Sequence, residues 1–497
     1  MQEIKARAKK YHLIKNWLFL AHIVLSLAGL LFLLSFGLSV YAKEKIILLT
    51  RNSFWLVAIY VFILDGASFL LSFPLCFYEG FILEHKFNLS SQKFPAWLKD
   101  TFKKQLIELL VFLVTAEVLY LFLRKTQDNW WIYAALFWIF LSVVFAKLTP
   151  ILLIPLFFKS SPVQDENLKA GIRSLVDKSG SKIKNIFIID FSKKTKKSNA
   201  MVCGLGKNRR ILLADNLVNE FDTEQVCSVV AHELGHEVYK DTLRLLIAGS
   251  IFSFFSFFAC DVFLRAALAR FGFKEIYDIA AFPLLAFGLS IVSLFILPFQ
   301  NGYSRRRESF ADLFALELTN DPLSFISMMK KLGEKNLADF SPNRIIEFLL
   351  YAHPPIEKRI RQAERFYKGE ERRKYARMDT VLPVELQINR ISALGAEIIF
   401  PWQQGFTQDI SYGGVALRVN FLKQDISGLG IGKIKVFLRI HLPRSKQPVS
   451  AQAQLIWIKS LPEAEGSYML GLSFESIRSQ DRLALIRFAR WRRLIRG

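Results

Sequence analysis

Residues 129–157 read NWWIYAALFWIFLSVVFAKLTPILLIPLF, in which Lys147 is the only charged side chain. A helix rises about 1.5 Å per residue, so about 20 apolar residues cross the apolar layer of a bilayer, which is roughly 30 Å thick. This stretch therefore predicts a membrane span. Further blocks of similar length and character lie at 15–41, 54–78, 104–124, 242–264 and 277–299. Together they predict a mostly α-helical polytopic membrane protein with six spans.

The composition fits a membrane protein, because 52% of the residues are hydrophobic and 46 are phenylalanine. The formal net charge of +23 would suggest a nucleic-acid partner in a soluble protein. Basic loops that flank spans and face anionic lipid explain this charge better. We therefore expect the membrane as a partner and no nucleic-acid polymer. The first apolar run is longer than the h-region of a signal peptide, which predicts an uncleaved span.

Cysteine usage and buried charges add two constraints. The four cysteines form no CxxC pair, which argues against a disulfide framework or a cysteine zinc site. Charged side chains that face lipid are costly, so those inside the apolar blocks should pair between helices or face a watery cavity. Both explanations remain open for Asp65, Glu117, Lys147 and Asp261.

The polar region 158–241, between the fourth and fifth blocks, predicts a mixed α+β structure. Its apolar runs change from helical spacing to short β-branched stretches with turn residues between them. The expected elements are a helix over 165–179, a strand over 183–190, a hairpin formed by 199–205 and 211–214, and a helix from 222 through 236.

The region 371–497 has a third character. Short alternating runs separated by turn residues predict a small antiparallel β-barrel, followed by a basic helix from 481 to 496. The expected strands include 384–388, 414–419, 434–440, 451–458 and 469–474. The predicted domains are thus the N-terminal transmembrane helices 1–157, a catalytic domain 158–370 that includes the last two spans, and the barrel 371–497.

The segment His232-Glu233-Leu234-Gly235-His236 lies in the last helix expected before the fifth span. Its i,i+4 spacing puts both imidazoles on one helical face, where they can hold one zinc ion. Glu233 follows the first imidazole and can take a proton from the attacking water as a general base. The pattern is typical of zinc metalloproteases.

A catalytic zinc usually needs a third protein ligand. Glu308 is the best candidate, and Asp312, one helical turn later, can accept a hydrogen bond from a ligand imidazole and fix its tautomer. Taken alone, both acids also fit an ordinary amphipathic helix. Two predicted spans separate His236 from Glu308, so the chain returns to the same side and one site can use both.

These motifs make residues 60–370 similar to the integral-membrane CAAX prenyl proteases of type I, the zinc-dependent family. The resemblance implies a helical barrel around a water-filled intramembrane chamber, with a zincin-like catalytic part. The matching stretches are Pro155-Leu156-Phe157, the region 81–88, Ser198-Asn199-Ala200 with Gly204, the HELGH segment, Ser304-Arg305 before Glu308 and Asp312, and His353-Pro354-Pro355.

The resemblance also implies roles for individual residues, beginning with a zinc ion on the three ligands named above. Asn199 and Ala200 would lie on an edge strand that pairs with the substrate backbone. His353 would stabilise the developing oxyanion or orient the substrate, although a turn histidine before two prolines is an equal alternative. One departure is Lys197, which stands where the family often has histidine before Ser-Asn-Ala. Another is the number of spans, since eukaryotic members carry seven.

The C-terminal region contains an RxxxR pattern, formed by Arg373 and Arg377 with Arg372 beside them. Guanidinium groups suit phosphates and can pair with a guanine edge. In so basic a chain, a membrane-surface patch is an alternative explanation.

A DxSxxG pattern follows, formed by Asp409, Ser411 and Gly414. Together with RxxxR and Gly471-Leu472-Ser473-Phe474, it makes this region similar to a PilZ domain. The resemblance implies that cyclic di-GMP binds to the three arginines, to Asp409 and Ser411, and to the backbone at Gly414.

The sequence therefore predicts a zinc metalloendopeptidase that acts on protein or peptide substrates and is regulated by cyclic di-GMP. The alternative is a membrane-anchored cyclic-di-GMP receptor or scaffold with little or no protease activity. Because this nucleotide is a bacterial cytoplasmic messenger, we expect a multi-pass protein of the bacterial inner membrane. With six spans, the N-terminus, the catalytic segment and the C-terminal domain all fall on the cytoplasmic side.

Overall fold

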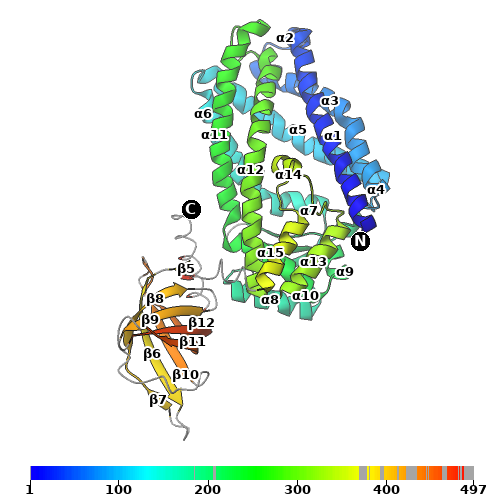
Figure 1. Ribbon diagram of the computed structural model, residues 1–497. Helices are drawn as coiled ribbons and strands as arrows, with labels where there is room; N and C mark the ends of the chain where they lie inside the picture. The colour runs from blue at the N-terminus through cyan, green and yellow to red at the C-terminus, as the bar shows by residue number, and fades with distance from the viewer. Residues whose placement is uncertain are drawn as a thin grey trace. The chain divides into compact units, whose positions relative to one another are not determined.

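The protein divides into two compact units, Met1–Ile172 with Ile183–Arg361, and Arg173–Lys182 with Gln362–Gly497. The first unit contains the long helices and the second contains the C-terminal strands (Figure 1). The computed structural model describes the chain except for residues 1, 184, 205–208, 369–377, 380, 392–396, 411–413, 421–433, 444, 446, 462–466, 479–480, 482–483, 486–487 and 489–497.

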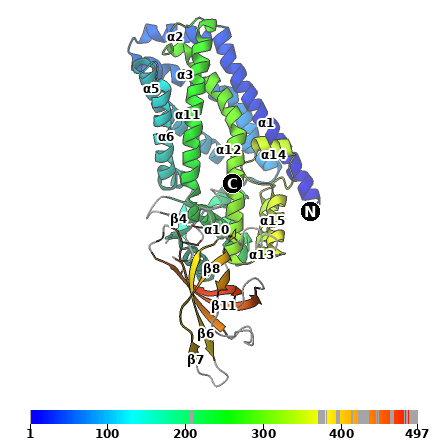
Figure 2. The same ribbon diagram turned by 60° about the vertical axis from the view of Figure 1, so that its left-hand side comes forward.

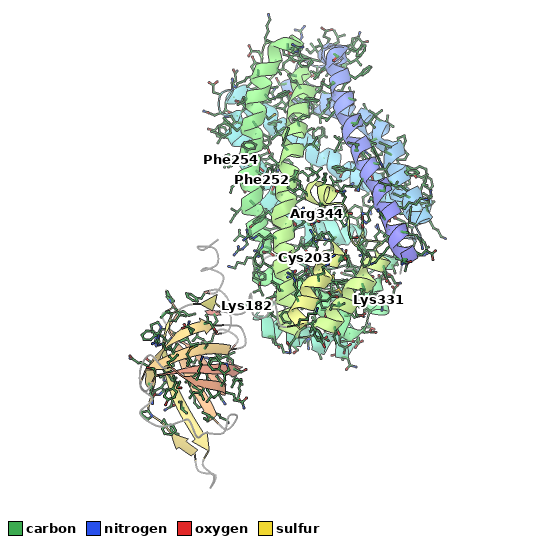
Figure 3. The ribbon with its side chains drawn as sticks, viewed as in Figure 1. Lys182, Cys203, Phe252, Phe254, Lys331 and Arg344 are labelled. Carbon is green, nitrogen blue, oxygen red and sulfur yellow. The ribbon has the colours of Figure 1, made fainter. Side chains whose placement is uncertain are left out.

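In the described part of the chain, six helical segments are long and apolar enough to cross a membrane, as the sequence predicts. Their outer surfaces carry many exposed apolar side chains, such as Ile251, Phe255 and Phe258. Figure 3 labels two half-buried neighbours of these residues, Phe252 and Phe254. A surface of this kind is stable only in lipid. The segments are α1 (Gln2–Ser35); α3 (Ser53–Phe77) with η1 (Tyr78–Leu83) and α4 (Glu84–Lys86); α5 (Phe94–Lys125); α6 (Trp130–Leu148) with η2 (Thr149–Leu153) and α7 (Ile154–Phe157); α11 (Asp241–Ala267) with η5 (Leu268–Phe271); and η6 (Ile279–Ala281) with α12 (Phe282–Thr319).

The last of these helices is longer than the sequence indicates. The apolar block at 277–299 predicts a span that ends near its last apolar residue, but α12 continues without a break to Thr319. It ends where Asn320 adopts a left-handed conformation with φ 52°, which asparagine tolerates better than most residues. Helices α11 and α12 run side by side in both views (Figures 1 and 2). One continuous helix thus carries Glu308 and Asp312 out of the apolar layer.

Two of the charged residues inside the apolar blocks pair with other helices. Asp65 on α3 accepts a hydrogen bond from Gln105 of α5 at 2.7 Å. Asp261 on α11 accepts one from the indole of Trp130 on α6 at 2.6 Å, and it is buried. Of the two explanations that the sequence left open, pairing between helices therefore holds for these two acids.

A small sheet and short helices form the polar part of the first unit. The sheet has the order β1-β2-β4-β3, in which β2 and β4 are parallel and the other neighbours are antiparallel. Strand β4 is almost fully buried, whereas β3 lies at an edge. The elements are β1 (Ser160–Pro162), β2 (Asn185–Ile189), β3 (Ala200–Cys203), β4 (Arg210–Ala214), α8 (Glu166–Ser179), α9 (Asp215–Glu220), α10 (Thr223–Val238), α13 (Pro322–Lys335), α14 (Arg344–Leu350) and α15 (Ile356–Tyr367); the short helix α2 (Leu38–Leu49) follows α1.

The C-terminal unit is a closed antiparallel barrel, as predicted. Among its described strands, six form a ring in the order β8-β9-β12-β11-β10-β6, and pairing of β6 with β8 closes it. Alternate residues such as Leu386, Leu438 and Leu470 fill the interior, which the period of two along a strand explains. The strands are β5 (Met378–Asp379), β6 (Pro383–Ile391), β7 (Glu397–Ile399), β8 (Gln403–Ile410), β9 (Gly414–Asn420), β10 (Ile434–Ile440), β11 (Val449–Ser460) and β12 (Ser467–Ile477).

Strand β8 was not expected from the pattern of apolar and polar residues, although buried and exposed residues do alternate along most of its length. Its sequence, QQGFTQDI, holds few of the β-branched residues that mark strands. Of the predicted C-terminal helix, residues 481, 484, 485 and 488 are described, and they are helical. Leu485 and Phe488 are buried in the barrel core, so this helix contributes to the packing of the barrel.

Candidate metal centre and active site

Helix α10 presents two imidazoles on one face. A capping box formed by Asp222 and Gln225 starts the helix, so its register relative to the histidines is well defined. The rings of His232 and His236 have centroids 4.8 Å apart and stand at 87° to each other. Their Nε2 atoms are 3.2 Å apart, so both nitrogens face one point.

Helix α12 brings the third side chain to that point. The Glu308 carboxylate lies 3.3 Å from Nε2 of His232 through Oε2 and 3.3 Å from Nε2 of His236 through Oε1. One ligand atom from each residue can be chosen so that the three atoms lie within 4.8 Å of one another. The site joins residues that are far apart in sequence, because both helices pack closely.

A glycine in the HELGH segment permits this close packing. A Cβ atom at Gly235 would lie 3.0 Å from Cα and 3.2 Å from the carbonyl oxygen of Ala311 on α12. Most side chains at this position would push the two helices apart. Gly235 and Ala311 are both fully buried, and Ala311 lies one helical turn after Glu308. The pair therefore sets the distance at which the carboxylate meets the imidazoles.

Two buried carboxylates orient the imidazoles by contacting Nδ1, the ring nitrogen that faces away from the metal centre. Nδ1 of His232 lies 2.9 Å from Asp312, and Nδ1 of His236 lies 2.8 Å from Asp241. An imidazole nitrogen that bonds a carboxylate is the protonated one, so Nε2 is the nitrogen that each ring can offer to a metal. Asp312 is where the sequence analysis expected it. Asp241 was missed, although its position five residues after His236, at the start of a span, is a usable signal.

Each of these carboxylates has a buried arginine as its partner. Nε of Arg359 donates to Asp312 at 2.8 Å, and Nε of Arg307 donates to Asp241 at 2.7 Å. Both guanidinium groups are more than nine-tenths buried. They neutralise the two acids and hold them in place, which a buried carboxylate requires. The sequence analysis missed both arginines, because a basic residue in so basic a chain carries little information.

The donor set fits a divalent metal ion. Two imidazole nitrogens and a carboxylate converge on one point. Histidine nitrogen and carboxylate oxygen are the ligands that catalytic zinc prefers. Burial lowers the pKa of His236, but its bonds to Asp241 and Glu308 raise the pKa to about 10. A metal that binds here must therefore displace a proton.

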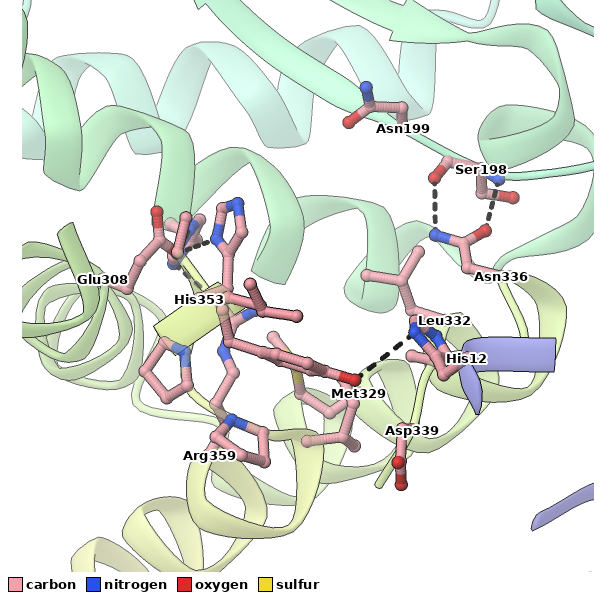
Figure 4. A pocket seen from close by; sticks show the side chains of 18 of the residues that line it. His12, Ser198, Asn199, Glu308, Met329, Leu332, Asn336, Asp339, His353 and Arg359 are labelled. Carbon is pink, nitrogen blue, oxygen red and sulfur yellow. Dashed lines mark hydrogen bonds and ion pairs between the residues drawn. The ribbon is translucent and has the colours of Figure 1, made fainter. Parts of the chain in front are cut away.

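The metal centre opens into a cavity of about 670 Å³ within the first unit. Glu233 lines the cavity together with His232 and Glu308, and Figure 4 shows Glu308 and His353 close together in its wall. His353, from the loop that precedes α15, reaches the same place, since its Nδ1 lies 3.0 Å from Oε2 of Glu308. His353 is largely exposed, so it faces the space in which a substrate would lie. The arrangement can therefore combine a metal, a carboxylate base and a second imidazole around one peptide bond.

The edge strand lies in the wall of the same cavity. Ser198, Asn199 and Ala200 line it, and β3 pairs only with β4 among the described strands. The carbonyl of Asn199 accepts a hydrogen bond from the amide of Ala214 at 2.9 Å, so the ladder extends one residue beyond the strand. The sequence expected an edge strand at this position, and the outer edge of β3 can accept an extended peptide.

In the barrel, the structure describes two of the residues expected to bind cyclic di-GMP. Asp409 lies near the end of β8, next to a bulge, and Gly414 starts β9. A Cβ atom at Gly414 would lie 2.2 Å from the carbonyl oxygen of Leu472, so the close approach of β12 requires glycine here. Arg372, Arg373, Arg377 and Ser411 lie outside the described residues.

Three family models match the chain in succession. Residues 1–159 match the CAAX prenyl protease N-terminal domain with five membrane helices, residues 162–366 match peptidase family M48, and residues 371–491 match the PilZ domain. Within the described part of 1–159, the structure has four helices of spanning length.

Curated relatives and a solved structure agree with these matches. An uncharacterized metalloprotease of Bacillus subtilis, YhfN, is 28% identical over 364 residues, which cover 72% of this chain and 85% of the relative. CAAX prenyl protease 1 of Saccharomyces cerevisiae is 29% identical over 321 residues, 60% of this chain and 70% of the relative. The crystal structure of S. mikatae Ste24p superimposes with a TM-score of 0.65 and 25% identity over 73% of this chain and 90% of that one.

The fold, the geometry of the metal centre and the order of the matches all agree. Of the candidate ligands, Glu308 lies on α12, which is long and apolar enough to cross a membrane, and the two histidines lie on α10, which directly precedes the spanning helix α11. By these matches, the chain joins the CAAX prenyl protease N-terminal domain and a family M48 peptidase domain in one Ste24p-like membrane metalloprotease, and it carries a PilZ domain at its C-terminus.

Proposed function

We propose that this protein is a zinc metalloendopeptidase that cleaves membrane-associated proteins and is regulated by cyclic di-GMP. The observation that carries the proposal is the convergence of His232, His236 and Glu308, with both imidazoles oriented by buried acids. A degenerate protease retained as a scaffold would have no need for so complete a set. This argues against the alternative of a receptor without protease activity.

Each residue of the centre has a defined task in this proposal. His232, His236 and Glu308 hold the zinc ion. The chemistry that zinc supplies when bound here is Lewis acidity toward the scissile carbonyl and the attacking water. Glu233 takes the proton from the water and later passes it to the leaving amine. Asp312 keeps the proton of His232 on Nδ1, so that Nε2 stays available.

The cavity provides groups that position the substrate. The outer edge of β3 at Asn199 and Ala200 pairs with the backbone of an extended substrate, which fixes the scissile bond without selecting its side chains. His353 donates a hydrogen bond to the oxyanion that develops on the carbonyl. Suitable substrates are membrane-associated chains, including CAAX-like C-termini and misfolded proteins.

We place the protein in the bacterial inner membrane, with its N-terminus, catalytic segment and C-terminal domain in the cytoplasm. Six spans put both termini on one side, and a cytoplasmic second messenger requires its receptor there. In this assignment residues 1–157 are the N-terminal membrane domain, 158–370 the protease domain, and 371–497 the cyclic-di-GMP domain. The binding residues are Arg372, Arg373, Arg377, Asp409, Ser411 and Gly414, and the nucleotide changes the rate of cleavage.

Substitution of the proposed base gives the decisive test. Glu233→Gln keeps the size of the side chain and the zinc ligands but cannot accept the proton, so cleavage should fall at least ~10³-fold with zinc content unchanged. Glu224→Gln, an exposed acid on the same helix, is the matched control. Zinc content is measured by metal analysis of the purified full-length protein. Cleavage is measured by comparing the proteomes of membranes that contain each variant.

A second arm of the experiment tests regulation. Cyclic di-GMP is added to the wild-type protein and to Arg373→Ala, which should bind it at least tenfold more weakly. The nucleotide should change cleavage by the wild type and leave the variant unaffected. Cleavage retained in Glu233→Gln would refute the enzyme, and nucleotide binding without any zinc-dependent cleavage would instead favour the receptor.

A further inference from the structure

The outer edge of β3 has a defined set of outward-facing backbone groups, and one of them, the N–H of Ala200, donates to Oδ1 of Asn199 at 2.9 Å. In an antiparallel ladder, successive residues point their N–H and C=O groups to opposite sides. Asn199 bonds Ala214 of β4 through its carbonyl. The backbone groups of Ser198, Ala200 and Val202 therefore point away from β4, toward the edge at which we propose that substrates bind. The inference below rests on that proposed function.

A side chain already occupies one end of this edge. The amide N–H of Ser198 donates to Oδ1 of Asn336 at 2.9 Å, and Nδ2 of Asn336 donates back to the carbonyl of Ser198 at 3.1 Å (Figure 4). An amide that both accepts and donates in this way takes the place of a residue in a neighbouring strand. The edge that a substrate can use therefore starts at the carbonyl of Ala200.

The position of Asn336 is held by packing on either side of it. Asn336 ends α13, and Leu337 follows in a left-handed conformation with φ 45°, which is strained for a branched side chain. Leu337 is buried in a cluster that includes Tyr11, Phe87 and Leu89. Burial of this side chain offsets the strain and fixes the direction in which the preceding amide points.

The strand segment on the other side of the contact is equally constrained. Lys197 forms an ion pair with Glu84 at 2.8 Å. Nδ2 of Asn216 donates to the carbonyl of Thr195 at 2.7 Å and to that of Lys197 at 3.1 Å. Ser198 thus cannot move away from Asn336 without breaking several contacts. The contact between Asn336 and Ser198 therefore forms a fixed block at this end of the edge, in the wall of the cavity.

We propose that Asn336 is a specificity-determining residue that limits how far a substrate strand can extend along β3. Asn336 and Ser198 line the same cavity as Glu233 and Glu308, so the distance from the block to the metal centre is fixed. A substrate that pairs antiparallel with β3 runs from Val202 toward Ser198, with its carboxyl end at the block. The enzyme therefore releases short C-terminal products and discriminates against chains that continue as a strand.

The test uses two synthetic peptide libraries with the same randomised core. In one, the chain ends within about four residues of the core, and in the other it continues for about ten more. Full-length protein in detergent with zinc is compared with Asn336→Ala, and products are identified by mass spectrometry. Lys335→Ala, at the same helix end but paired with Glu220, is the matched control.

The wild type should cleave the short library and release products of narrow length range. Asn336→Ala should raise kcat/KM for the extended library by roughly tenfold, because about two backbone hydrogen bonds become available, and should yield longer C-terminal products. Asn336→Asp loses only the bond to the Ser198 carbonyl and should act in the same direction to a smaller extent. If Asn336→Ala does not fold, Asn336→Asp can be used in its place to test the inference.

Two outcomes overturn the inference, and they differ in what else they overturn. If both Asn336 variants cleave the two libraries in the same ratio and at the same bonds as the wild type, then Asn336 sets no limit, while the protease assignment stands. If the wild type shows no cleavage that depends on Glu233, then the proposed function fails with it.

Discussion

The metal centre and the barrel of this chain differ in what positions their described functional residues. Each imidazole of the metal centre is carried by a capped helix, backed by a buried acid, and the acid is backed by a buried arginine. In the barrel, Asp409 and Gly414 lie where strands end and begin, and the arginines of the motif precede the first strand of the ring. The first arrangement is fixed by contacts between buried side chains, and the described part of the second by the pairing of β8, β9 and β12.

This contrast determines what kind of evidence each region can give. A site held by buried contacts can be judged by geometry, because few alternative positions of Glu308 are compatible with the packing of α10 on α12. Of the barrel residues expected to bind cyclic di-GMP, the structure describes Asp409 and Gly414, so for this region ligand binding is the better criterion. The two regions should therefore respond differently to similar substitutions.

The largest expected effect is the loss of a zinc ligand. Glu308→Gln removes the only carboxylate of the ligand set, so zinc content should fall from about one ion per chain to near zero and cleavage should fall to background. Cyclic-di-GMP binding by the barrel should remain unchanged. Metal analysis of purified protein and a nucleotide-binding assay measure both quantities.

Glu233→Gln provides the control for this prediction, because it should abolish cleavage while zinc remains bound. Stoichiometric zinc in Glu308→Gln would remove this residue from the ligand set. Loss of nucleotide binding in the same variant would show that the two regions are not independent in stability.

A smaller effect on zinc binding is expected from the buried acids that orient the zinc ligands. Asp241→Asn cannot accept the Nδ1–H of His236 as strongly and leaves Arg307 without its charged partner, so zinc affinity should fall about 10–100-fold. Competition with a chelator measures the change. Asp261→Asn, on the same helix but bonded to Trp130 and Arg265, should leave zinc affinity unchanged. Equal zinc affinities in the two variants would mean that Asp241 has only a structural role.

Much of the metal centre could be predicted from the sequence, for a physical reason. Residues four apart in a helix share a face, so His232 and His236 are neighbours whatever the rest of the fold does. Glu308 could be assigned because two spans return the chain to the same side. These inferences use only helix geometry and the thickness of a bilayer, and both are properties of short stretches of chain.

Asp241, Arg307 and Arg359 could not be predicted in the same way. Each acts through a contact between elements that are distant in sequence, and a single charged residue gives no sign of burial. Likewise, the sequence could not show that Asn336 bonds Ser198, because this contact depends on the direction in which α13 ends. The exposed polar residues of β8 concealed a strand, since only its neighbours in the ring make it one.

The smallest effects should come from replacing one glycine by alanine, in one variant at the metal centre and in another variant in the barrel. Gly235→Ala puts a Cβ against the backbone of Ala311 at 3.0 Å, so α10 and α12 must separate by a few tenths of an ångström. Zinc should remain bound, but cleavage should fall by roughly tenfold because the imidazoles move relative to Glu308. Gly414→Ala puts a Cβ 2.2 Å from the Leu472 carbonyl oxygen and should destabilise the barrel by about 1–3 kcal/mol.

Measured together, the two variants separate the regions. Gly414→Ala should weaken nucleotide binding and leave zinc content and basal cleavage unchanged, whereas Gly235→Ala should lower cleavage and leave nucleotide binding and zinc content unchanged. Gly249→Ala, on α11 with no atom within 4 Å of the added Cβ, serves as the neutral control. If Gly235→Ala cleaves at the wild-type rate, the spacing of α10 and α12 is not what limits the metal centre. The rigidity inferred for that region would then have to come from the buried acids and arginines alone.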